Sequence, residues 1–260
     1  MPIKFDIKQS LNHFDLIINV ELASNNIVGL FGQSGSGKTT LLRAIAGLNG
    51  YASGSVTFNN KQWQLNQKSS TNNTPAIGMV FQDSRLFEHL TVDKNLSIVD
   101  KLQTPDTRSA LINDFGISSL LTKYAHQLSA GQKQRVALVR SLMATPDLLL
   151  LDEPLSALDV NAKHKIMATL KSYSHQHKLP MIYVSHHIDE INYLCDELIL
   201  IEQGQLIDAG ECDNVLKNNN LLPHQSDVIS VDGDKKQITL QLSNEAYLQL
   251  SSRKNINLSD

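Results

Sequence analysis

The sequence contains little cysteine and no long apolar run, and each shortage excludes a class of protein. Cys195 and Cys212 are the two cysteines among 260 residues, so a disulfide-stabilised secreted fold is excluded and reduced thiols are expected. A membrane-spanning helix needs roughly 18 consecutive apolar residues, whereas the run at Leu148–Leu151 ends at Asp152. The segment that begins at Met1 lacks the apolar core of a secretory signal. The sequence therefore predicts a cytoplasmic protein that reaches a membrane only through a partner.

An excess of charge of either sign is also missing. The chain has 23 Lys and Arg residues against 26 Asp and Glu residues, which gives a net charge of −3. No strong attraction to nucleic acid or to anionic lipid is therefore expected. With 41% hydrophobic and 19% charged residues, the composition is that of an ordinary globular protein. The length suits one large α/β domain, with or without a small appendage.

Short apolar segments recur along the chain and alternate with segments of helical spacing. Continuous apolar runs, typical of strands buried on both faces, occupy residues 27–31, 77–81, 148–151, 181–184 and 198–201. Helices of about 15 and about 8 residues fit between the last three runs. Strands of a half-exposed sheet are predicted at 3–7, 14–22 and 53–58. This order predicts an α/β fold with a parallel sheet covered on both faces.

Three regions depart from this alternation. Residues 83–127 are less regular and more helical, and they are interpreted as an inserted subdomain. The segment Gln64–Thr74 is polar throughout and predicts a solvated loop. From Ser226 onward, apolar and polar residues mostly alternate, which indicates a short β-rich extension. The predicted organisation is a main domain at 1–225, a helical subdomain within it at about 83–135, and an extension at 226–260.

A glycine-rich loop follows the apolar run at 27–31 and precedes a segment of helical spacing that ends at Gly47. It matches the pattern G-x-x-x-x-G-K-[ST] in full, with Gly32, Gln33, Ser34, Gly35, Ser36, Gly37, Lys38 and Thr39. The glycines let backbone N–H groups point at phosphate oxygens beside the N-terminus of the next helix. Lys38 is expected to reach the β- and γ-phosphates, Thr39 to hold Mg²⁺, and Thr40 to lie beside the same nucleotide.

Two carboxylates end the apolar run at 148–151. Burial of this run carries Asp152 to the carboxyl edge of the sheet, beside the phosphate loop. A carboxylate there can orient Mg²⁺, and Glu153 is placed to activate an attacking water as a general base. An acidic turn at a strand end is the simpler interpretation of an isolated Asp-Glu pair. The phosphate loop upstream favours the nucleotide site.

Four further motifs accompany these two and complete a recognisable order. They are Val80-Phe81-Gln82-Asp83, Leu128-Ser129-Ala130-Gly131-Gln132, Ser156-Ala157-Leu158-Asp159 and Tyr183-Val184-Ser185-His186. With them, residues 1–215 resemble the ATPases of ATP-binding-cassette (ABC) transporters. The resemblance implies a P-loop NTPase fold, in which a RecA-like parallel core carries an antiparallel β edge and an inserted helical subdomain. It also implies that the chain binds and hydrolyses ATP with Mg²⁺.

The resemblance assigns roles to residues whose chemistry is not evident alone. Gln82 is expected to bind Mg²⁺ and to sense the γ-phosphate, and His186 to hydrogen-bond that phosphate and to hold the attacking water. Asp159 is expected to contact a second copy of the chain. The ATP of that copy is expected to be bound by Ser129, Ala130, Gly131 and Gln132, the last of which is predicted to begin a helix. A histidine taken alone at such a position is more often a packing or helix-capping residue.

Three positions depart from the family pattern. Ala130 stands where glycine is usual, and a single methyl group is expected to be tolerated there. His187 stands where aspartate is frequent, which affects none of the roles above. The aromatic residue that stacks on adenine has no clear counterpart. Phe14 and His13 are the available residues, and packing against the sheet is the alternative for Phe14.

The segment after Gln82 resembles that of importer cassettes, in which apolar residues such as Leu86 and Phe87 receive a helix of the membrane permease. Core packing is the simpler interpretation of both side chains. Among importers, the resemblance is to the ATPases of molybdate uptake. It implies a peripheral subunit at the cytoplasmic face of the inner membrane, with permease subunits, an indirect substrate-binding protein and no nucleic acid as partners. Residues 226–260 then correspond to a truncated oxyanion-binding domain or to a separate set of strands.

Other functions stay open at this point. Importers of iron, sulfate or polyamines use near-identical cassettes, so the substrate is not fixed by these motifs. A soluble cassette ATPase of DNA repair or translation is the rival class. Such proteins carry two cassettes or a long coiled coil, whereas about 90 residues separate Lys38 from Ser129 here. A simple P-loop kinase would not need the motifs at 128–132 and 156–159.

Overall fold

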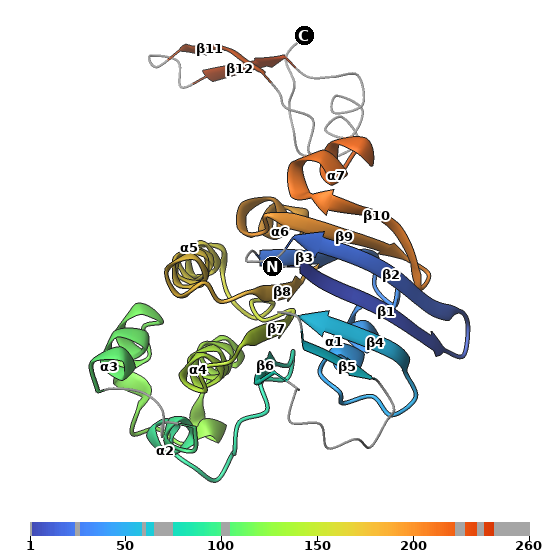
Figure 1. Ribbon diagram of the computed structural model, residues 1–260. Helices are drawn as coiled ribbons and strands as arrows, with labels where there is room; N and C mark the ends of the chain where they lie inside the picture. The colour runs from blue at the N-terminus through green and yellow to red at the C-terminus, as the bar shows by residue number, and fades with distance from the viewer. Residues whose placement is uncertain are drawn as a thin grey trace. The chain divides into compact units, whose positions relative to one another are not determined.

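The computed structural model of the chain describes residues 2–23, 27–58, 61–64, 75–99, 105–221, 227–232 and 237–241 (Figure 1). The chain divides into two compact units, Met1–Val215 and Leu216–Asp260. Within the described part of the second unit, β11 (Asp227–Asp232) and β12 (Gln237–Gln241) form an antiparallel hairpin. This hairpin lies in the segment for which the sequence predicts β structure.

The described strands of the first unit form one sheet. In chain order they are β1 (Pro2–Ser10), β2 (Asp15–Ala23), β3 (Ile27–Phe31), β4 (Ser53–Phe58), β5 (Lys61–Gln64), β6 (Ile77–Val80), β7 (Leu148–Asp152), β8 (Met181–Val184), β9 (Glu197–Glu202) and β10 (Gln205–Glu211). Their order across the sheet is β5-β4-β1-β2-β10-β9-β3-β8-β7-β6. This α/β sheet confirms the predicted fold class, including the parallel core and the antiparallel edge.

The half of the sheet from β9 to β6 is parallel. Its central strands show no alternation in sequence because both of their faces are buried: Leu148, Leu149, Leu150 and Leu151 each have 0% exposure. Burial of one such side chain contributes about 1.5–3 kcal/mol to folding. The register sets Leu30 of β3 and Asp152 of β7 on either side of Val184 of β8. Residues that directly follow these strands therefore meet at one edge.

The half from β5 to β2 is antiparallel, with β10 joining it to the core. Along β1, Ile3, Phe5 and Ile7 are buried while the residues between them are more exposed, as the alternation predicts. The strands β5 and β10 were not predicted. The polar segment Gln64–Thr74, predicted as a loop, starts within β5 at Gln64, and its remaining residues lie outside the described ranges.

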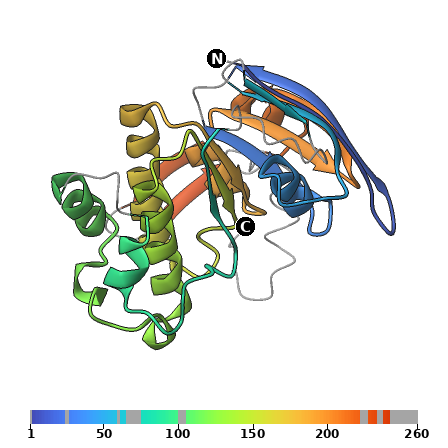
Figure 2. The same ribbon diagram turned by 60° about the horizontal axis from the view of Figure 1, so that its bottom comes forward.

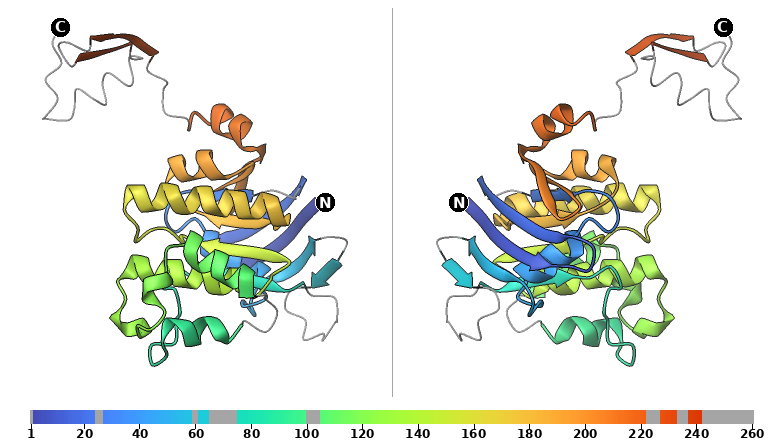
Figure 3. Two further views of the ribbon diagram at one scale, coloured as in Figure 1. Left: turned by 90° about the vertical axis from the view of Figure 1, so that its left-hand side faces the viewer. Right: turned by 90° about the vertical axis from the view of Figure 1, so that its right-hand side faces the viewer.

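Helices cover both faces of the parallel half. They are α1 (Lys38–Ile45), α2 (Val92–Ser97), α3 (Pro105–Asp114), α4 (Ala130–Met143), α5 (Val160–His177) and α6 (Ile188–Leu194), and α7 (Cys212–Asn218) follows β10. Figures 1 and 2 show α1 on one face and α4 and α5 on the other, with α4 between the sheet and the pair α2 and α3. The two side views of Figure 3 show α5 in front of the sheet from one side and α1 from the other.

The helix α4 begins two residues before the predicted start at Gln132, because Ser129 caps it. The Ser129 hydroxyl accepts a hydrogen bond from the Gln132 N–H at 3.3 Å, and the Gln132 side-chain oxygen accepts one from the Ser129 N–H at 3.0 Å. This reciprocal pair satisfies two backbone donors that the first turn of a helix leaves without partners. Ala130 and Gly131 therefore lie inside the first turn of the helix.

Both cysteines are buried and carry free thiols. Cys195 packs against β3, where its Sγ lies 3.0 Å from the place that a Cβ at Gly29 would occupy. Burial raises the pKa of the Cys195 thiol well above its usual range, and burial with the charges of Asp213 and Asp196 raises the pKa of Cys212 to about 11. Within the described helices, none combines the length and apolar character of a membrane span.

These thiols are expected to be inert while the chain is folded. The thiolate is the reactive species, and a thiol with a pKa of about 11 is ionised in about one molecule in a thousand at pH 8. We expect native protein to react with a chromogenic disulfide reagent at least roughly a hundredfold more slowly than glutathione does. In denaturant, both thiols should react at the rate of a free thiol. Rapid labelling of both thiols in native buffer would contradict the buried placement.

Candidate functional site

The phosphate loop between β3 and α1 closes around the side chain of Lys38. Its ammonium group donates hydrogen bonds to the carbonyl oxygens of Gly32 and Gln33, both at 2.7 Å. Burial lowers the pKa of Lys38, and the charges of Glu153 and Asp152 oppose that shift. Gly32 has no space for a side chain, since a Cβ there would lie 2.1 Å from the Ile201 carbonyl oxygen. The loop is therefore held tightly between β3 and β9, with a buried cation at its centre.

Thr39, the second residue of α1, connects this loop to the end of β7. Its hydroxyl donates a hydrogen bond of 3.0 Å to Asp152 Oδ1, across 113 residues of sequence. Asp152 is 3% exposed. Burial raises the pKa of its carboxyl group, while the Thr39 hydrogen bond and the charges of Arg43 and Lys38 oppose the shift. Thr39, Asp152 and Gln82 all line one small hollow of about 280 Å³.

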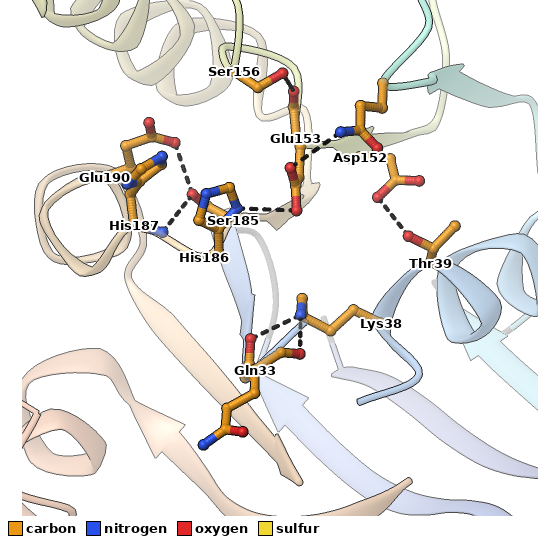
Figure 4. A network of polar contacts seen from close by, with 12 residues as sticks. Gln33, Lys38, Thr39, Asp152, Glu153, Ser156, Ser185, His186, His187 and Glu190 are labelled. Atoms are coloured by element: carbon orange, nitrogen blue, oxygen red, sulfur yellow. Dashed lines mark hydrogen bonds and ion pairs between the residues drawn. The ribbon is translucent and has the colours of Figure 1, made fainter. Parts of the chain in front are cut away.

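Glu153 stands at the centre of the site (Figure 4). Its backbone is left-handed, with φ of 47°, and its N–H donates to the Val184 carbonyl at 3.1 Å. This turn ends β7 and directs the carboxylate across the carboxyl ends of the strands. Glu153 Oε1 lies 3.1 Å from His186 Nδ1, and Oε2 accepts a 3.5 Å contact from Gln82 Nε2. Three motifs that are far apart in sequence therefore meet at one carboxylate.

An open cavity of about 930 Å³ lies in front of these residues. Among its walls are the phosphate loop and the start of α1, with Gln82, Glu153 and His186 at one side. The walls also include the end of β1 and its connection to β2, from Gln9 to Phe14, together with Tyr51. The volume is within the range of small-molecule sites, about 300–1,000 Å³. The cavity thus collects the predicted nucleotide residues Ser34, Gly35, Gly37, Lys38, Thr39, Thr40 and Gln82.

The two residues considered for the adenine base, His13 and Phe14, both line this cavity. Phe14 is half-buried and packs against the loop, where its ring edge lies 3.5 Å from the place of a Cβ at Gly37. This contact is with the phosphate loop, whereas the alternative raised from the sequence was packing against the sheet. Tyr51 is 86% exposed and also lines the cavity. The sequence gave no reason to place Tyr51 there, because it lies in the connection between α1 and β4.

A second set of predicted residues lies elsewhere. Ser129, Ala130, Gly131, Gln132 and Asp159 do not line the cavity among the described residues. Ser129, Ala130 and Asp159 are exposed, and Asp159 caps α5 by accepting a hydrogen bond from the Ala162 N–H at 2.9 Å. Gly131 is buried, and a Cβ there would lie 2.8 Å from the Ala157 carbonyl oxygen. The first turn of α4 thus packs directly on the turn before α5.

Gln134 joins these two turns, and the sequence analysis did not identify it. It is 2% exposed, and its amide donates to Ser156 Oγ at 2.9 Å and accepts from the Ala157 N–H at 3.0 Å. Ser156 Oγ also donates to the Glu153 carbonyl at 3.1 Å. A polar side chain on the apolar face of a predicted helix was the available signal. Its partners lie 22 and 23 residues away and could not be inferred from spacing.

A second group that the sequence analysis missed lies behind His186. Glu190 of α6 is buried and binds Tyr183, Ser185 and Lys163, which come from β8, the turn after β8, and α5. Figure 4 shows Glu190 and Ser185 beside His186 and His187. Two further histidines, His175 and His177, are exposed in the last turn of α5. The described residues contain no cluster of three His, Cys, Asp or Glu side chains suited to a metal ion.

Known proteins of similar sequence or structure help to identify the family of this chain. A molybdenum import ATP-binding protein, ModC, of Saccharophagus degradans is 40% identical over 205 residues, which cover 77% of this chain and 57% of that protein. The chain therefore spans less than two thirds of the length of this relative. CbiO1 of Clostridium perfringens, part of the ABC transporter complex cbiONQ, has a TM-score of 0.70 at 27% identity, covering 84% of this chain and 92% of that one.

A third similar protein is an ATP-binding cassette whose structure is a dimer in a post-hydrolysis state with ADP and phosphate. It has a TM-score of 0.68 at 24% identity, covering 82% of this chain and 99% of that one, and this likeness concerns the fold alone. The ABC transporter family matches residues 17–156, which is more than half of the 260 residues. The matched region runs from β2 through the phosphate loop and the carboxylates after β7. By this match, the chain belongs to the ABC transporter family.

Proposed function

We propose that the chain is the ATP-hydrolysing subunit of a membrane importer for molybdate or a related oxyanion. It works as a head-to-tail dimer bound to permease subunits at the cytoplasmic face of the membrane, with a substrate-binding protein acting indirectly. The observation that carries the proposal is the meeting of Lys38, Glu153 and His186 at one nucleotide-sized cavity. Similarity to a molybdenum import ATP-binding protein supports the substrate class.

Lys38 is suited to bind the β- and γ-phosphates. Its ammonium now donates to the carbonyl oxygens of Gly32 and Gln33, and phosphate oxygens are stronger acceptors because they are charged. The loop N–H groups and the N-terminus of α1 add further donors for an anion. In this proposal, Lys38 exchanges carbonyl partners for phosphate oxygens and later stabilises the charge that develops in the transition state.

Mg²⁺ fits the residues beside this loop. Thr39 offers a hydroxyl oxygen, Gln82 an amide oxygen and Asp152 a carboxylate oxygen, and oxygen atoms are the ligands that Mg²⁺ prefers. All three line one hollow, and Thr39 already contacts Asp152 at 3.0 Å. These residues are proposed to hold the ion, which when bound neutralises charge on the β- and γ-phosphates.

Glu153 is proposed as the general base that activates the attacking water. Gln82 contacts one oxygen of the Glu153 carboxylate and His186 contacts the other. These two contacts limit the rotation of the carboxylate. A general base must lie within hydrogen-bond reach of the proton that it removes, and Glu153 faces the cavity where the γ-phosphate would lie. His186 is placed to hydrogen-bond that phosphate and the water. Positioning of this kind provides most of the catalysis in phosphoryl transfer.

The separate position of the second motif set supports a dimer. Ser129, Ala130, Gly131 and Gln132 form the N-cap and the first turn of α4, and the N-terminus of a helix favours an anion. They are proposed to bind the γ-phosphate of ATP held by a second copy, with Asp159 at the contact between copies. A cassette of the same fold has been solved as a dimer with ADP and phosphate. Each catalytic site would then need residues from two chains.

The segment that follows Gln82 is suited to contact a permease. Asn95 of α2, which is fully buried, accepts a hydrogen bond from the Phe87 N–H at 2.9 Å and donates to the carbonyl oxygens of Phe87, Leu90 and Thr91. These bonds fix the loop and leave the Phe87 side chain 47% exposed. A rigid loop with an exposed aromatic ring, next to Gln82, can transmit movement between the site and a membrane subunit. Residues 226–260 are proposed as a separate β-rich extension.

The nucleotide chemistry is tested by comparing three variants with the wild-type chain. Lys38→Ala should weaken ATP binding and abolish hydrolysis, because the buried phosphate-binding cation is removed. Glu153→Gln should keep ATP binding but lose hydrolysis by about a hundredfold or more, and it should accumulate as an ATP-bound dimer in gel filtration. Glu202→Gln, an exposed position at the end of β9, serves as the matched control and should behave like wild type. A Glu153→Gln variant that stays monomeric with ATP would contradict the head-to-tail dimer.

The importer role and its substrate are tested in proteoliposomes. The chain is reconstituted with a molybdate permease and its oxyanion-binding protein, or with the permease and binding protein of a sulfate, iron or polyamine importer, and ATP hydrolysis is measured with the matching substrate. We expect molybdate to raise the hydrolysis rate above the rate without substrate. If only one of the other substrates raised the hydrolysis rate, that substrate, and not molybdate, would be the one transported. Stimulation by DNA or ribosomes, with no effect of the permease, would contradict the importer.

A further inference from the structure

Glu190 lies buried directly behind the turn that carries His186. Its side chain is 8% exposed and is fully used: Oε1 binds the Lys163 ammonium at 2.7 Å, and Oε2 accepts hydrogen bonds from the Tyr183 hydroxyl at 2.7 Å and the Ser185 hydroxyl at 2.8 Å. These partners come from α5, from β8 and from the turn itself. A buried carboxylate is costly to maintain unless it is paired and hydrogen-bonded, so this network needs an explanation.

The Ser185 hydroxyl connects Glu190 to the backbone on the far side of His186. Its single proton is donated to Glu190, which leaves its lone pairs free to accept the His187 N–H at 3.0 Å. The residue before His186 and the residue after it are thereby tied to one hydroxyl group. His186 itself is exposed, and in the described structure its contacts with Glu153 and His187 are side-chain contacts at the cavity edge. The backbone of the turn must therefore define where its imidazole lies.

Lys163 keeps Glu190 in the form that this arrangement needs. Burial raises the pKa of the Glu190 carboxyl, but hydrogen bonds from Lys163, Tyr183 and Ser185 together outweigh burial and lower it. An ionised carboxylate accepts hydrogen bonds only, so Ser185 must act as the donor. A protonated carboxyl could instead donate to Ser185 and compete for the lone pairs that receive the His187 N–H. Lys163 also lies in the first turn of α5, where its N–H bonds the carbonyl oxygen of Asp159.

We infer that Glu190 is a positioning residue for hydrolysis: through Ser185 it holds the turn at 185–187 so that His186 keeps its contact with Glu153. The inference rests on the proposed function, because it assigns a role in the hydrolytic step at that same site. Glu190 touches neither the cavity wall nor Glu153 among the described contacts. It acts through the position of His186, and a shift of about 1 Å in a catalytic group can lower a rate about a hundredfold.

The test compares two hydroxyl groups that bind the same oxygen of Glu190. Ser185→Ala removes the donor that also holds the His187 N–H, whereas Tyr183→Phe removes a donor without contact to the turn. ATP-binding stoichiometry, KM and kcat are measured on the same preparations, with kcat expressed per nucleotide-binding site so that unfolded protein is not counted. Glu190→Gln is measured in parallel, since it keeps the shape of the side chain but loses the charge that pairs with Lys163.

We expect Ser185→Ala to lower kcat by about 10- to 100-fold with KM for ATP within about twofold of wild type, because the phosphate loop is unchanged. Glu190→Gln should also lower kcat, and Tyr183→Phe should lower kcat by less than about threefold. Equal losses in Ser185→Ala and Tyr183→Phe, or an unchanged kcat in Ser185→Ala and Glu190→Gln, would overturn the inference while leaving the proposed function intact. A wild-type chain that binds ATP without hydrolysing it would overturn the proposed function and the inference together.

Discussion

The site depends on the burial of three neighbouring parallel strands. β3, β8 and β7 lie side by side, and the register aligns Leu30, Val184 and Asp152 across them. Because these strands are short, apolar and buried on both faces, slippage of one strand would move polar residues that follow it, such as Glu153, into the apolar interior. The three loops that follow these strands therefore begin side by side at one edge of the sheet. The phosphate loop, the turn at Glu153 and the turn at His186 are neighbours for this reason, although more than a hundred residues separate the first from the others.

Several charged side chains lie at this same edge of the sheet, and most of their hydrogen bonds are to groups inside the protein. Lys38 lies near two carboxylates, Asp152 and Glu153, and all three are at least partly removed from water. In this state, Lys38 binds loop carbonyls and Asp152 binds Thr39, so each charged group has polar partners inside the protein. Adding a triphosphate would bring further negative charge to a place where Lys38 and Arg43 already face the two carboxylates. The N-terminus of α1 and a bound cation would offset this charge, and Thr39 and Asp152 are among the residues proposed to hold Mg²⁺.

The sequence predicted the elements whose pattern is strong and local. The apolar runs at 148–151 and 181–184 could be recognised because both faces of these strands are buried. β5 has four residues, mostly polar, and β10 has a register shift between Leu206 and Asp208, so neither shows a regular apolar period. Edge and linking strands gain their stability from pairing with neighbours, which spacing along one chain does not reveal.

The same distinction between local and distant information applies to the site. Lys38 and Glu153 lie in short motifs whose chemistry is legible in sequence. The roles of Gln134 and Glu190 arise from partners on other elements, at separations of 22 residues to Ser156 and 27 residues to Lys163. Either residue reads in isolation as a polar position on a helix. Only the fold shows that each is buried and fully bonded.

Those distant contacts also connect the two ends of the proposed dimer site within one chain. Gln134 binds Ser156, and Ser156 binds the carbonyl oxygen of Glu153, so the helix that Ser129 caps is joined by two hydrogen bonds to the turn at Glu153. Gln134 is buried, so loss of its partner would leave a polar amide away from water, which is costly. A shift of α4 would therefore tend to carry Glu153 with it. In the proposed dimer, ATP held by the second copy contacts Ser129 of the first copy. Binding of that ATP would therefore affect the position of Glu153 in the first copy, the carboxylate proposed to act on the ATP of the first copy.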